Sequence, residues 1–421
     1  MGDRYQRTGA HLPSRLLPTE PAFWRSPVRG IRFTAVLGVV LLAGITLLFV
    51  TGLLSYAAYN PDLTAVNDKT PEKGWLGFYL FAWPTGPHWL YRLTQGVHVT
   101  LGITLVPVLL AKLWSVVPKL FTLPSARSAG HALERLSLLL LVGGALFEFV
   151  TGLLNIQLEY LFPGSFYPLH FYGAWVFFAA FLAHTCLKLP QALRALRQGV
   201  LSAEKDVLAS PDPAAPTVSR RGALAVVGAG SLLLLLTSAG RSFDGGLRRT
   251  ALLTPRGGAE PAPGPNGFQV NGTAAKVGIT PTVTDERWRL TVAGPAREIR
   301  LSREELLTMA QHSAALPIAC VEGWSTSDQW WRGVRLRDLA ALAGFPEGPP
   351  GVLVESLQRS GPFRTVGLRD NQVRDARSLL ALSVNGEDLS PDHGYPARVI
   401  VPAAPGVMNT KWVSRLTFGE L

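Results

Sequence analysis

The chain has 421 residues, of which 48% are hydrophobic, and a formal net charge of +11 at pH 7. This length allows two or three domains, and the hydrophobic content favours a protein with membrane spans. Nucleic-acid binding is a poor explanation for the charge, because the basic residues flank apolar runs, where they would orient the chain in a membrane. Only two cysteines are present, Cys186 and Cys320, which excludes a disulfide framework.

Five stretches are long and apolar enough to cross a bilayer. We place them near residues 33–55, 89–111, 133–155, 168–189 and 222–240. The first four predict a helical membrane domain within residues 1–200, and the fifth predicts an anchoring helix within residues 201–267. Glu148 lies inside the third span, where an acid is costly, and we expect it to hydrogen-bond to a neighbouring helix.

The basic residues predict the direction of the spans. They cluster before the first span, between the second and third, and between the fourth and fifth. The only basic residues in the other connecting segments, 56–88 and 156–167, are Lys69 and Lys73. The positive-inside rule therefore predicts a cytoplasmic N-terminus and places residues 241–421 on the outer face of the plasma membrane.

A paired arginine, Arg220-Arg221, precedes the fifth span. It resembles a twin-arginine export signal, which would make the twin-arginine translocase a partner during export; ordinary positive-inside flanking is the alternative. That export route carries folded, cofactor-loaded proteins, so it predicts a cofactor in the segment that follows. A clear Ala-x-Ala cleavage site is absent, and we expect the helix to stay as an anchor.

Four histidines lie in or at the ends of the predicted spans: His98, His131, His170 and His184. His170 and His184 are 14 residues apart, within about 40° of one helix face and roughly 21 Å apart along the axis. This spacing suits two stacked haems, each completed by an imidazole from another helix. His98 and His170 both lie in the outer half of the membrane, so they would share an outer haem, with His88 as the alternative ligand. His131 and His184 both lie near the cytoplasmic side and would share an inner haem.

The 14-residue spacing resembles the membrane cytochrome b subunits of formate dehydrogenase and nickel–iron hydrogenase. In those subunits the inner haem usually takes a histidine from the first span, and that span has none here. We therefore predict one or two haems b for each chain.

Residues 241–267 form a Gly- and Pro-rich linker, and the sequence from Phe268 onward is globular and β-rich. We predict a hairpin at 286–301, a helix opened by a capping box at 302–311 and a strand–helix unit at 333–344. Five further strands are predicted at 352–357, 363–366, 380–384, 397–401 and 412–418. Residues 268–421 therefore predict a mixed α+β domain.

Cys320 follows the apolar run 315–319 and precedes a short polar turn that contains Glu322. A thiol at a strand end, beside a carboxylate and aromatic side chains, can be a soft-metal ligand or a nucleophile. Most lone cysteines are instead small buried hydrophobes. Position alone leaves these alternatives open.

Four motifs follow one another in this region. They are Cys320-Val-Glu-Gly-Trp-Ser325 with the subsequent Trp331-Arg-Gly-Val-Arg-Leu-Arg-Asp-Leu339, then Asn385-Gly-Glu387, His393-Gly-Tyr-Pro-Ala-Arg-Val-Ile-Val-Pro402 and Asn409-Thr-Lys-Trp412. Over roughly residues 268–421 the combination resembles the molybdopterin domain of the sulfite oxidase family. It is most similar to the catalytic subunit of periplasmic methionine-sulfoxide reductase. The resemblance implies a molybdopterin cofactor.

The resemblance also implies residue roles. Cys320 matches the thiolate that ligates molybdenum, and Glu322 matches a carboxylate beside the metal that can manage protons, with a surface acid as the alternative. Arg398 and Lys411 match cationic contacts to the pterin phosphate, with ordinary surface charge as the alternative. The remaining cofactor contacts implied are Asn271, Ser356, His393, Asn409 and Thr410.

The chain departs from true sulfite oxidases in two respects. The immunoglobulin-like dimerisation domain does not follow the molybdopterin domain, so a dimer is less expected. An arginine-lined sulfite pocket is not identifiable, although Arg332, Arg335, Arg359 and Arg364 are available cations.

Together these features predict a membrane α-helical bundle of four spans plus a fifth anchoring span, followed by an α+β sulfite oxidase-like molybdopterin domain. The predicted function is oxygen-atom transfer to or from a small molecule at an outer-face molybdenum centre, coupled to haem b and the quinone pool, with a sulfoxide-type substrate favoured. The alternatives are a sulfite-type oxidase that passes electrons to quinone, and an electron-transfer or binding protein with an inactive outer domain. A cysteine hydrolase that uses Cys320 with His312 or His393 is disfavoured, because no Ser/Cys–His–Asp signature is present.

Overall fold

The computed structural model describes residues 17–20, 23–63, 66–67, 79–121, 128–156, 166–198, 210, 212–243, 245–253, 263–270, 272–295, 297–359 and 364–421. Asn271, one of the predicted cofactor contacts, lies outside these ranges. The backbone of His131 is helical, but its side chain is outside the description.

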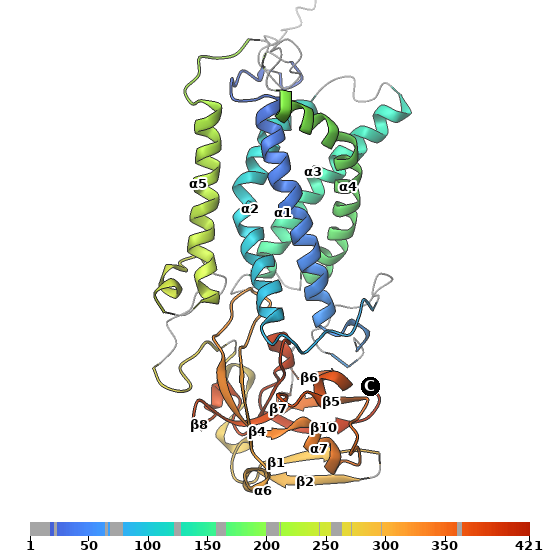
Figure 1. The fold of residues 1–421 in the computed structure, drawn as a ribbon, viewed down its shortest axis with the longest axis vertical. Helices are drawn as coiled ribbons and strands as arrows, with labels where there is room; N and C mark the ends of the chain where they lie inside the picture. Colours follow the sequence, from blue (N-terminus) through green and yellow to red (C-terminus); the bar gives the residue numbers. More distant parts are fainter. Residues whose placement is uncertain are drawn as a thin grey trace, which may run out of the picture. The chain divides into compact units, whose positions relative to one another are not determined.

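Five helices are long and apolar enough to cross a membrane by length and composition (Figure 1). They are α1 (Ile31–Ala58), α2 (Leu90–Leu120), α3 (Ala129–Asn155), α4 (Tyr167–Gln198) and α5 (Arg220–Ala239). Each coincides with one predicted span. α2 and α4 end at Leu120 and Gln198 rather than at 111 and 189. In α4 the residues after Pro190 are Ala, Leu, Gln and Arg, which favour helix. The predicted hydrogen bond from Glu148 to a neighbouring helix is confirmed, since its carboxylate pairs with His170 of α4.

The chain forms two compact units. Unit 1 comprises Met1–Leu47, Gly102–Val150 and His170–Leu234, and unit 2 comprises Leu48–Leu101, Thr151–Leu169 and Leu235–Leu421. The C-terminal sheets and the chain segment 48–101 therefore belong to the same unit.

Small residues bring the helices of unit 1 together. A Cβ added at Gly44 of α1 would lie 2.5 Å from Cδ1 of Leu105 on α2, and one at Gly144 of α3 would lie 3.1 Å from Cβ of Phe177 on α4. Such distances show that the helix backbones approach more closely than a larger residue allows, which is how helices commonly pack in membranes.

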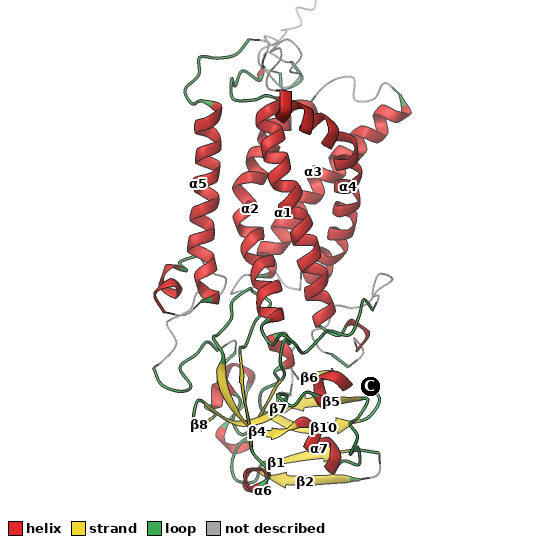
Figure 2. Cartoon of the chain, viewed as in Figure 1, coloured by secondary structure: helices red, strands yellow, loops and turns green. Residues whose placement is uncertain are grey.

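Two β-sheets form the C-terminal region (Figure 2). The first has the strand order β2-β1-β10-β5-β6, formed by β1 (Arg289–Ala293), β2 (Glu298–Ser302), β5 (Gly351–Ser356), β6 (Thr365–Arg369) and β10 (Val413–Phe418). β1 and β10 are parallel, and the other neighbours are antiparallel. The second has the order β3-β4-β7-β8, formed by β3 (His312–Leu316), β4 (Gln329–Arg335), β7 (Leu379–Val384) and β8 (Glu387–Asp388), with β9 (Arg398–Ile400) also paired to β7.

Local signals in the sequence account for several of these elements. The predicted hairpin is the antiparallel pair β1–β2. The capping box is confirmed, because Ser302 Oγ accepts from the Glu305 N–H at 3.1 Å and the Glu305 carboxylate accepts from the Ser302 N–H at 2.7 Å. The helix it opens, α6 (Arg303–Thr308), ends before the predicted residue 311. Of the remaining short helices, α7 (Leu336–Leu342) was predicted and α8 (Asp370–Arg374) was not.

β7 lies between two hydrophobic cores. Leu380 and Leu382 belong to the core of the first sheet, and Leu379 and Ala381 belong to the core that contains Cys320. A strand that is buried on both faces needs a continuous apolar run, and Leu379–Val384 supplies one. The segment around Cys320 is therefore held against the centre of the fold.

Gly333 provides a test of this packing. It sits where the register of β4 against β7 shifts, and a Cβ there would lie 2.0 Å from the carbonyl oxygen of Leu380. We expect Gly333→Ala to lower the free energy of unfolding by about 2 kcal/mol. The matched control is Gly246→Ala, where an added Cβ meets open space. Thermal unfolding of the full chain measures both, and equal melting temperatures for the two variants would contradict the expectation.

Candidate functional site

Backbone hydrogen bonds fix Cys320 in a tight turn. Its N–H donates to the carbonyl of Trp324 at 3.0 Å, and the Gly323 N–H donates back to the carbonyl of Cys320 at 3.0 Å. Gly323 has a φ of 83°, a left-handed conformation that glycine adopts without strain. The thiol-bearing residue is only 2% exposed. The chain therefore holds one cysteine rigidly, as a metal ligand requires.

Polar groups are buried around this turn. Glu322 is 4% exposed, so it is not the surface acid that the sequence left as an alternative. The indole Nε1 of Trp324 and the hydroxyl of Ser325 are buried and have no hydrogen-bond partner among the described residues. Buried donors normally find acceptors. These two fit a site whose acceptors come from a bound group.

Arg398 is a buried cation that main-chain carbonyls hold in place. Its Nη1 and Nη2 donate to the carbonyls of His393 and Asn409 at 3.1 and 3.0 Å, and its guanidinium lies 5.0 Å from the centroid of the Trp331 ring. Its Nε is buried without a partner in the described part of the chain. Burial lowers the pKa of Arg398 to about 9. A cation in this state gains much from a nearby anion.

Lys411 is a second, partly buried cation. Its Nζ donates to the carbonyls of Gly272 and Asp392 at 2.5 and 2.8 Å and lies 4.5 Å from the ring of Trp412. Burial, and then the charge of Arg398, lowers the pKa of Lys411 to about 7, and the charge of Asp392 partly opposes this shift. Within the ranges that the structure describes, neither Lys411 nor Arg398 forms an ion pair with a carboxylate. Two neighbouring cations without a carboxylate ion pair fit a phosphate-bearing ligand.

His393 lies next to Arg398, whose guanidinium donates to its carbonyl. Its ring stacks on Phe268 with 3.8 Å between centroids, and its Nε2 lies 2.8 Å from the carbonyl oxygen of Asn266. Burial, followed by the charge of Arg398, lowers the pKa of His393 to about 4. The ring is therefore neutral at physiological pH, and its Nε2–H donates to Asn266.

Three other predicted cofactor contacts, Ser356, Asn409 and Thr410, lie close to the two cations in the sequence or bind their backbone. Ser356 Oγ donates to the carbonyl of Lys411 at 2.8 Å, so it holds the backbone at that cation. Asn409 Oδ1 accepts from the Val401 N–H at 2.9 Å, while its Nδ2 is buried with no partner in the described residues. Thr410 is buried, and its carbonyl accepts from the Val399 N–H. Asn409 therefore keeps a donor for a ligand.

Sequence reasoning overlooked Gly394. Its φ is 109°, and an added Cβ would lie 3.1 Å from the Cβ atoms of both Arg398 and Lys411. A glycine here lets the chain pass closely between the two cations. Its position directly after His393 in the motif was the available signal.

The structure does not bring all the alternative site residues together. Arg332, Arg359 and Arg364 are exposed, which does not support an arginine-lined pocket. His312 pairs with Asp338 at 3.5 Å, and His393 with Asn266, so neither ring's known partner supports a cysteine hydrolase.

His98 of α2 is held through one ring nitrogen. Its Nδ1 lies 3.0 Å from the carbonyl oxygen of Leu48 and 3.1 Å from Thr51 Oγ1. A Cβ at Gly52 would lie 3.1 Å from its Cε1, so the glycine makes room for the ring. Metal-ligating histidines are commonly oriented by such a hydrogen bond at the other ring nitrogen.

His170 of α4 shows the same pattern. Its Nδ1 lies 3.1 Å from the carboxylate of Glu148, which is 7% exposed. Carboxylate–histidine pairs commonly orient metal ligands. His88, the alternative outer ligand, instead uses its Nε2 to bind Asp328 at 3.0 Å.

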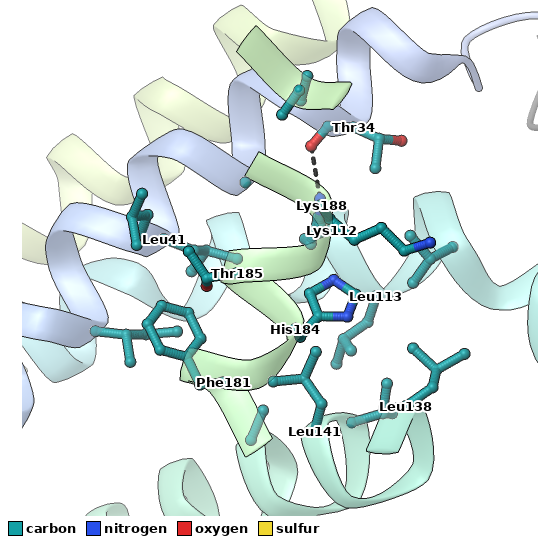
Figure 3. Close-up of a pocket in the computed structure, with 18 of the residues that line it drawn as sticks. Thr34, Leu41, Lys112, Leu113, Leu138, Leu141, Phe181, His184, Thr185 and Lys188 are labelled. Atoms are coloured by element: carbon teal, nitrogen blue, oxygen red, sulfur yellow. Dashed lines mark hydrogen bonds between the residues drawn. The ribbon is translucent and has the colours of Figure 1, made fainter. Parts of the chain in front are cut away.

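His184 lines a cavity of about 350 Å³ within unit 1 (Figure 3). The wall is apolar, with Leu113 of α2, Leu138 of α3 and Phe181 of α4 among its members. Its cations are Lys112, Lys119, Arg135 and Lys188. No acidic residue is among the described residues that line it. The cavity therefore suits an apolar molecule that carries carboxylates.

The buried state of Lys411 predicts a pH dependence in cofactor-free protein. Between about pH 7 and its ordinary pKa, Lys411 is neutral when folded and protonated when unfolded, so stability rises with pH and is lost as pH falls towards 7. We expect Lys411→Met to reduce this rise between pH 7 and 10, measured by thermal unfolding. The exposed Lys276 is the control, and Lys276→Met keeps the wild-type slope. An unchanged slope in Lys411→Met would contradict the assignment.

Comparison with known proteins agrees with this geometry. Residues 277–420 match the family model described as an oxidoreductase molybdopterin binding domain. An uncharacterized oxidoreductase of Bacillus subtilis (strain 168), YuiH, is 32% identical over 133 residues, which cover 31% of this chain and 65% of that protein.

Two further relatives have named activities. The mitochondrial sulfite oxidase of Drosophila melanogaster is 28% identical over 33% of this chain and 28% of its own length. The NADH nitrate reductase of Spinacia oleracea is 31% identical over 33% of this chain and 18% of its own length. The chain spans less than two thirds of the length of each of these relatives. Residues 277–420 of the chain therefore match an oxidoreductase molybdopterin-binding domain, and about a third of the chain is similar to a sulfite oxidase and a nitrate reductase.

Proposed function

We propose that the chain is a membrane-bound molybdoenzyme that couples haem b and quinone electron transfer to oxygen-atom transfer at the outer face, where it reduces a sulfoxide-type substrate. The observation that carries this proposal is the buried Cys320 turn together with the cations Arg398, which is buried, and Lys411, which is partly buried. Main-chain carbonyls hold both cations, and neither has a carboxylate ion pair in the described chain.

Each of these residues would hold a different part of the cofactor. The Cys320 thiolate would ligate molybdenum, and Arg398 and Lys411 would bind the pterin phosphate with charge-assisted hydrogen bonds. Asn409 Nδ2 would supply a neutral donor. When bound, the molybdenum cofactor supplies two-electron oxygen-atom transfer, and the protein supplies ligation, electrostatics and access.

The acid on the Cys320 turn leads us to propose an uncharged substrate. Glu322, two residues along the same turn, is buried, and a carboxylate there would disfavour sulfite next to the metal. Reduction of a sulfoxide consumes two electrons and two protons and yields a sulfide and water. Glu322 is placed to carry a proton to the departing oxygen. The sulfite oxidases among the relatives favour sulfite oxidation as the second candidate.

The helical part is proposed to supply the electrons. His98 and His170 are each oriented through Nδ1, which supports them as haem ligands. The cavity beside His184 offers an apolar wall for a macrocycle and cations for its propionates, which supports an inner haem there; His131 is the proposed second ligand. The five apolar helices support a membrane location. The distribution of basic residues and the Arg220-Arg221 pair support a domain outside the membrane that is reached by twin-arginine export. The quinone pool is the proposed redox partner.

Replacing Cys320 tests the metal assignment. We expect Cys320→Ser to reduce sulfoxide reduction more than 100-fold, because a serine is a harder and far less acidic ligand than a thiolate. Cys186→Ser is the control, since Cys186 is exposed. Dimethyl sulfoxide reduction with a dye donor and molybdenum by elemental analysis are the measurements. Full activity in Cys320→Ser with normal molybdenum content would refute the proposal.

Replacing His98 tests the haem assignment. Pyridine haemochrome analysis of the purified chain should find haem b, and His98→Leu should lose one haem while molybdenum content stays constant. His312→Gln is the control, because His312 lies on β3, far along the chain from the helices. Wild-type protein without haem, or His98→Leu with unchanged haem content, would contradict the ligand assignment.

A further inference from the structure

The N-terminal part of α2 packs on the Cys320 turn within unit 2. The side-chain amide of Gln95 donates to the carbonyl of Val321. A Cβ at Gly323 would lie 2.6 Å from Cβ of Val99, so the helix and the turn are in direct contact there. Gln95 and Val99 are four residues apart and therefore lie on one face of the helix. That face of α2, which is outside the residues matched by the family model, holds the turn that carries the proposed metal ligand.

Gln95 is itself held by α1. Ser55 Oγ donates to Gln95 Oε1 at 2.6 Å, and the two residues are only 6% and 5% exposed. Because the amide oxygen accepts from Ser55, the amide nitrogen is the atom that binds Val321. Buried hydrogen bonds of this kind are costly to break, since each partner would stay unpaired away from water. The spacing between α2 and the turn is therefore set by a fixed side chain.

The same part of α2 carries His98. This histidine lies three residues after Gln95, which is about 4.5 Å along the helix axis. Its Nδ1 lies close to Leu48 and Thr51 of α1, and these two residues share a helix face with Ser55. One face of α1 therefore fixes both the proposed haem ligand and the residue that binds the turn.

We propose that this part of α2 is the electron-transfer contact between the haem at His98 and the molybdenum at Cys320. Gln95 and Val99 are the positioning residues that keep the contact closed. The inference rests on the proposed function, because it takes His98 and Cys320 as metal ligands. Electron tunnelling weakens steeply with distance and passes better through bonds and hydrogen bonds than across a gap. The route from His98 along α2 to Gln95, and by its hydrogen bond to the Val321 carbonyl, is continuous.

The electrons balance along this route. Each transfer oxidises one ferrous haem to the ferric state and reduces the metal by one electron. Two transfers supply the two electrons that reduction of one sulfoxide consumes.

Haem reoxidation in the full-length, cofactor-loaded chain tests the inference. The chain is reduced and mixed with dimethyl sulfoxide in a stopped-flow instrument, and the haem b absorbance records the rate at which electrons leave the haem. A second assay drives dimethyl sulfoxide reduction with a reduced dye that donates to the metal directly. The ratio of the two rates separates the contact from the chemistry at the metal, because only the first rate depends on the contact.

Gln95→Leu and Val99→Ala are the test variants. The first removes the donor to Val321, and the second leaves a gap between the helix and the turn. We expect the ratio to fall about tenfold in Gln95→Leu, because small displacements from the working geometry are costly, and to fall less in Val99→Ala. Thr94→Val is the matched control. Thr94 is 6% exposed on the same helix and its hydroxyl donates to the carbonyl of Tyr91, so the variant keeps the wild-type ratio.

The outcomes separate this inference from the proposed function. A wild-type ratio in both test variants, with normal haem and molybdenum content, overturns the inference alone. An equal fall of both rates, or loss of molybdenum from both variants, also overturns it, because the two residues would then support the fold and not the transfer. An equal fall of the ratio in Thr94→Val does so too. A wild-type chain that lacks haem b or molybdenum, or whose haem dimethyl sulfoxide does not reoxidise, overturns the proposed function and this inference together.

Discussion

The site depends on two neighbouring basic side chains, Arg398, which is buried, and Lys411, which is partly buried. Arg398 and Lys411 are bound only by main-chain carbonyls among the described residues, and burial lowers the pKa of both. An unbalanced pair of this kind costs stability unless an anion joins it. The surrounding construction serves to keep the pair in place: Ser356 fixes the backbone at Lys411, and Gly394 lets the chain pass between the two side chains.

Two other titratable residues of unit 2, His393 and Glu322, are arranged around these cations so that no third positive charge is added. His393 stays neutral next to Arg398, so it adds no third charge and can stack on Phe268. The carboxylate of Glu322 lies instead on the Cys320 turn. In the proposed function, the basic side chains that would hold the cofactor and the acid that would carry protons thus lie on different loops of one domain.

The sequence predicted most of what local pattern or motif can encode. The five helices, the β1–β2 hairpin and the Ser302 capping box follow from runs of a few residues, and the structure contains them. The candidate site residues after Cys320 were predicted from motif spacing, and they stay predictions. Gly394 was missed for a physical reason, because its importance comes from its backbone angle and from the close approach of Arg398 and Lys411.

The hydrogen bond between Gln95 and the Val321 carbonyl limits how the sequence of the Cys320 turn can vary. Gln95 binds the carbonyl oxygen of Val321 rather than its side chain, so many residue types at position 321 preserve the bond. Gly323 has no such latitude, since both its φ and Val99 exclude a side chain. An insertion or deletion between residues 320 and 323 would move the carbonyl away from Gln95. We therefore expect relatives with the same helices to differ freely at 321 while keeping the length of this loop.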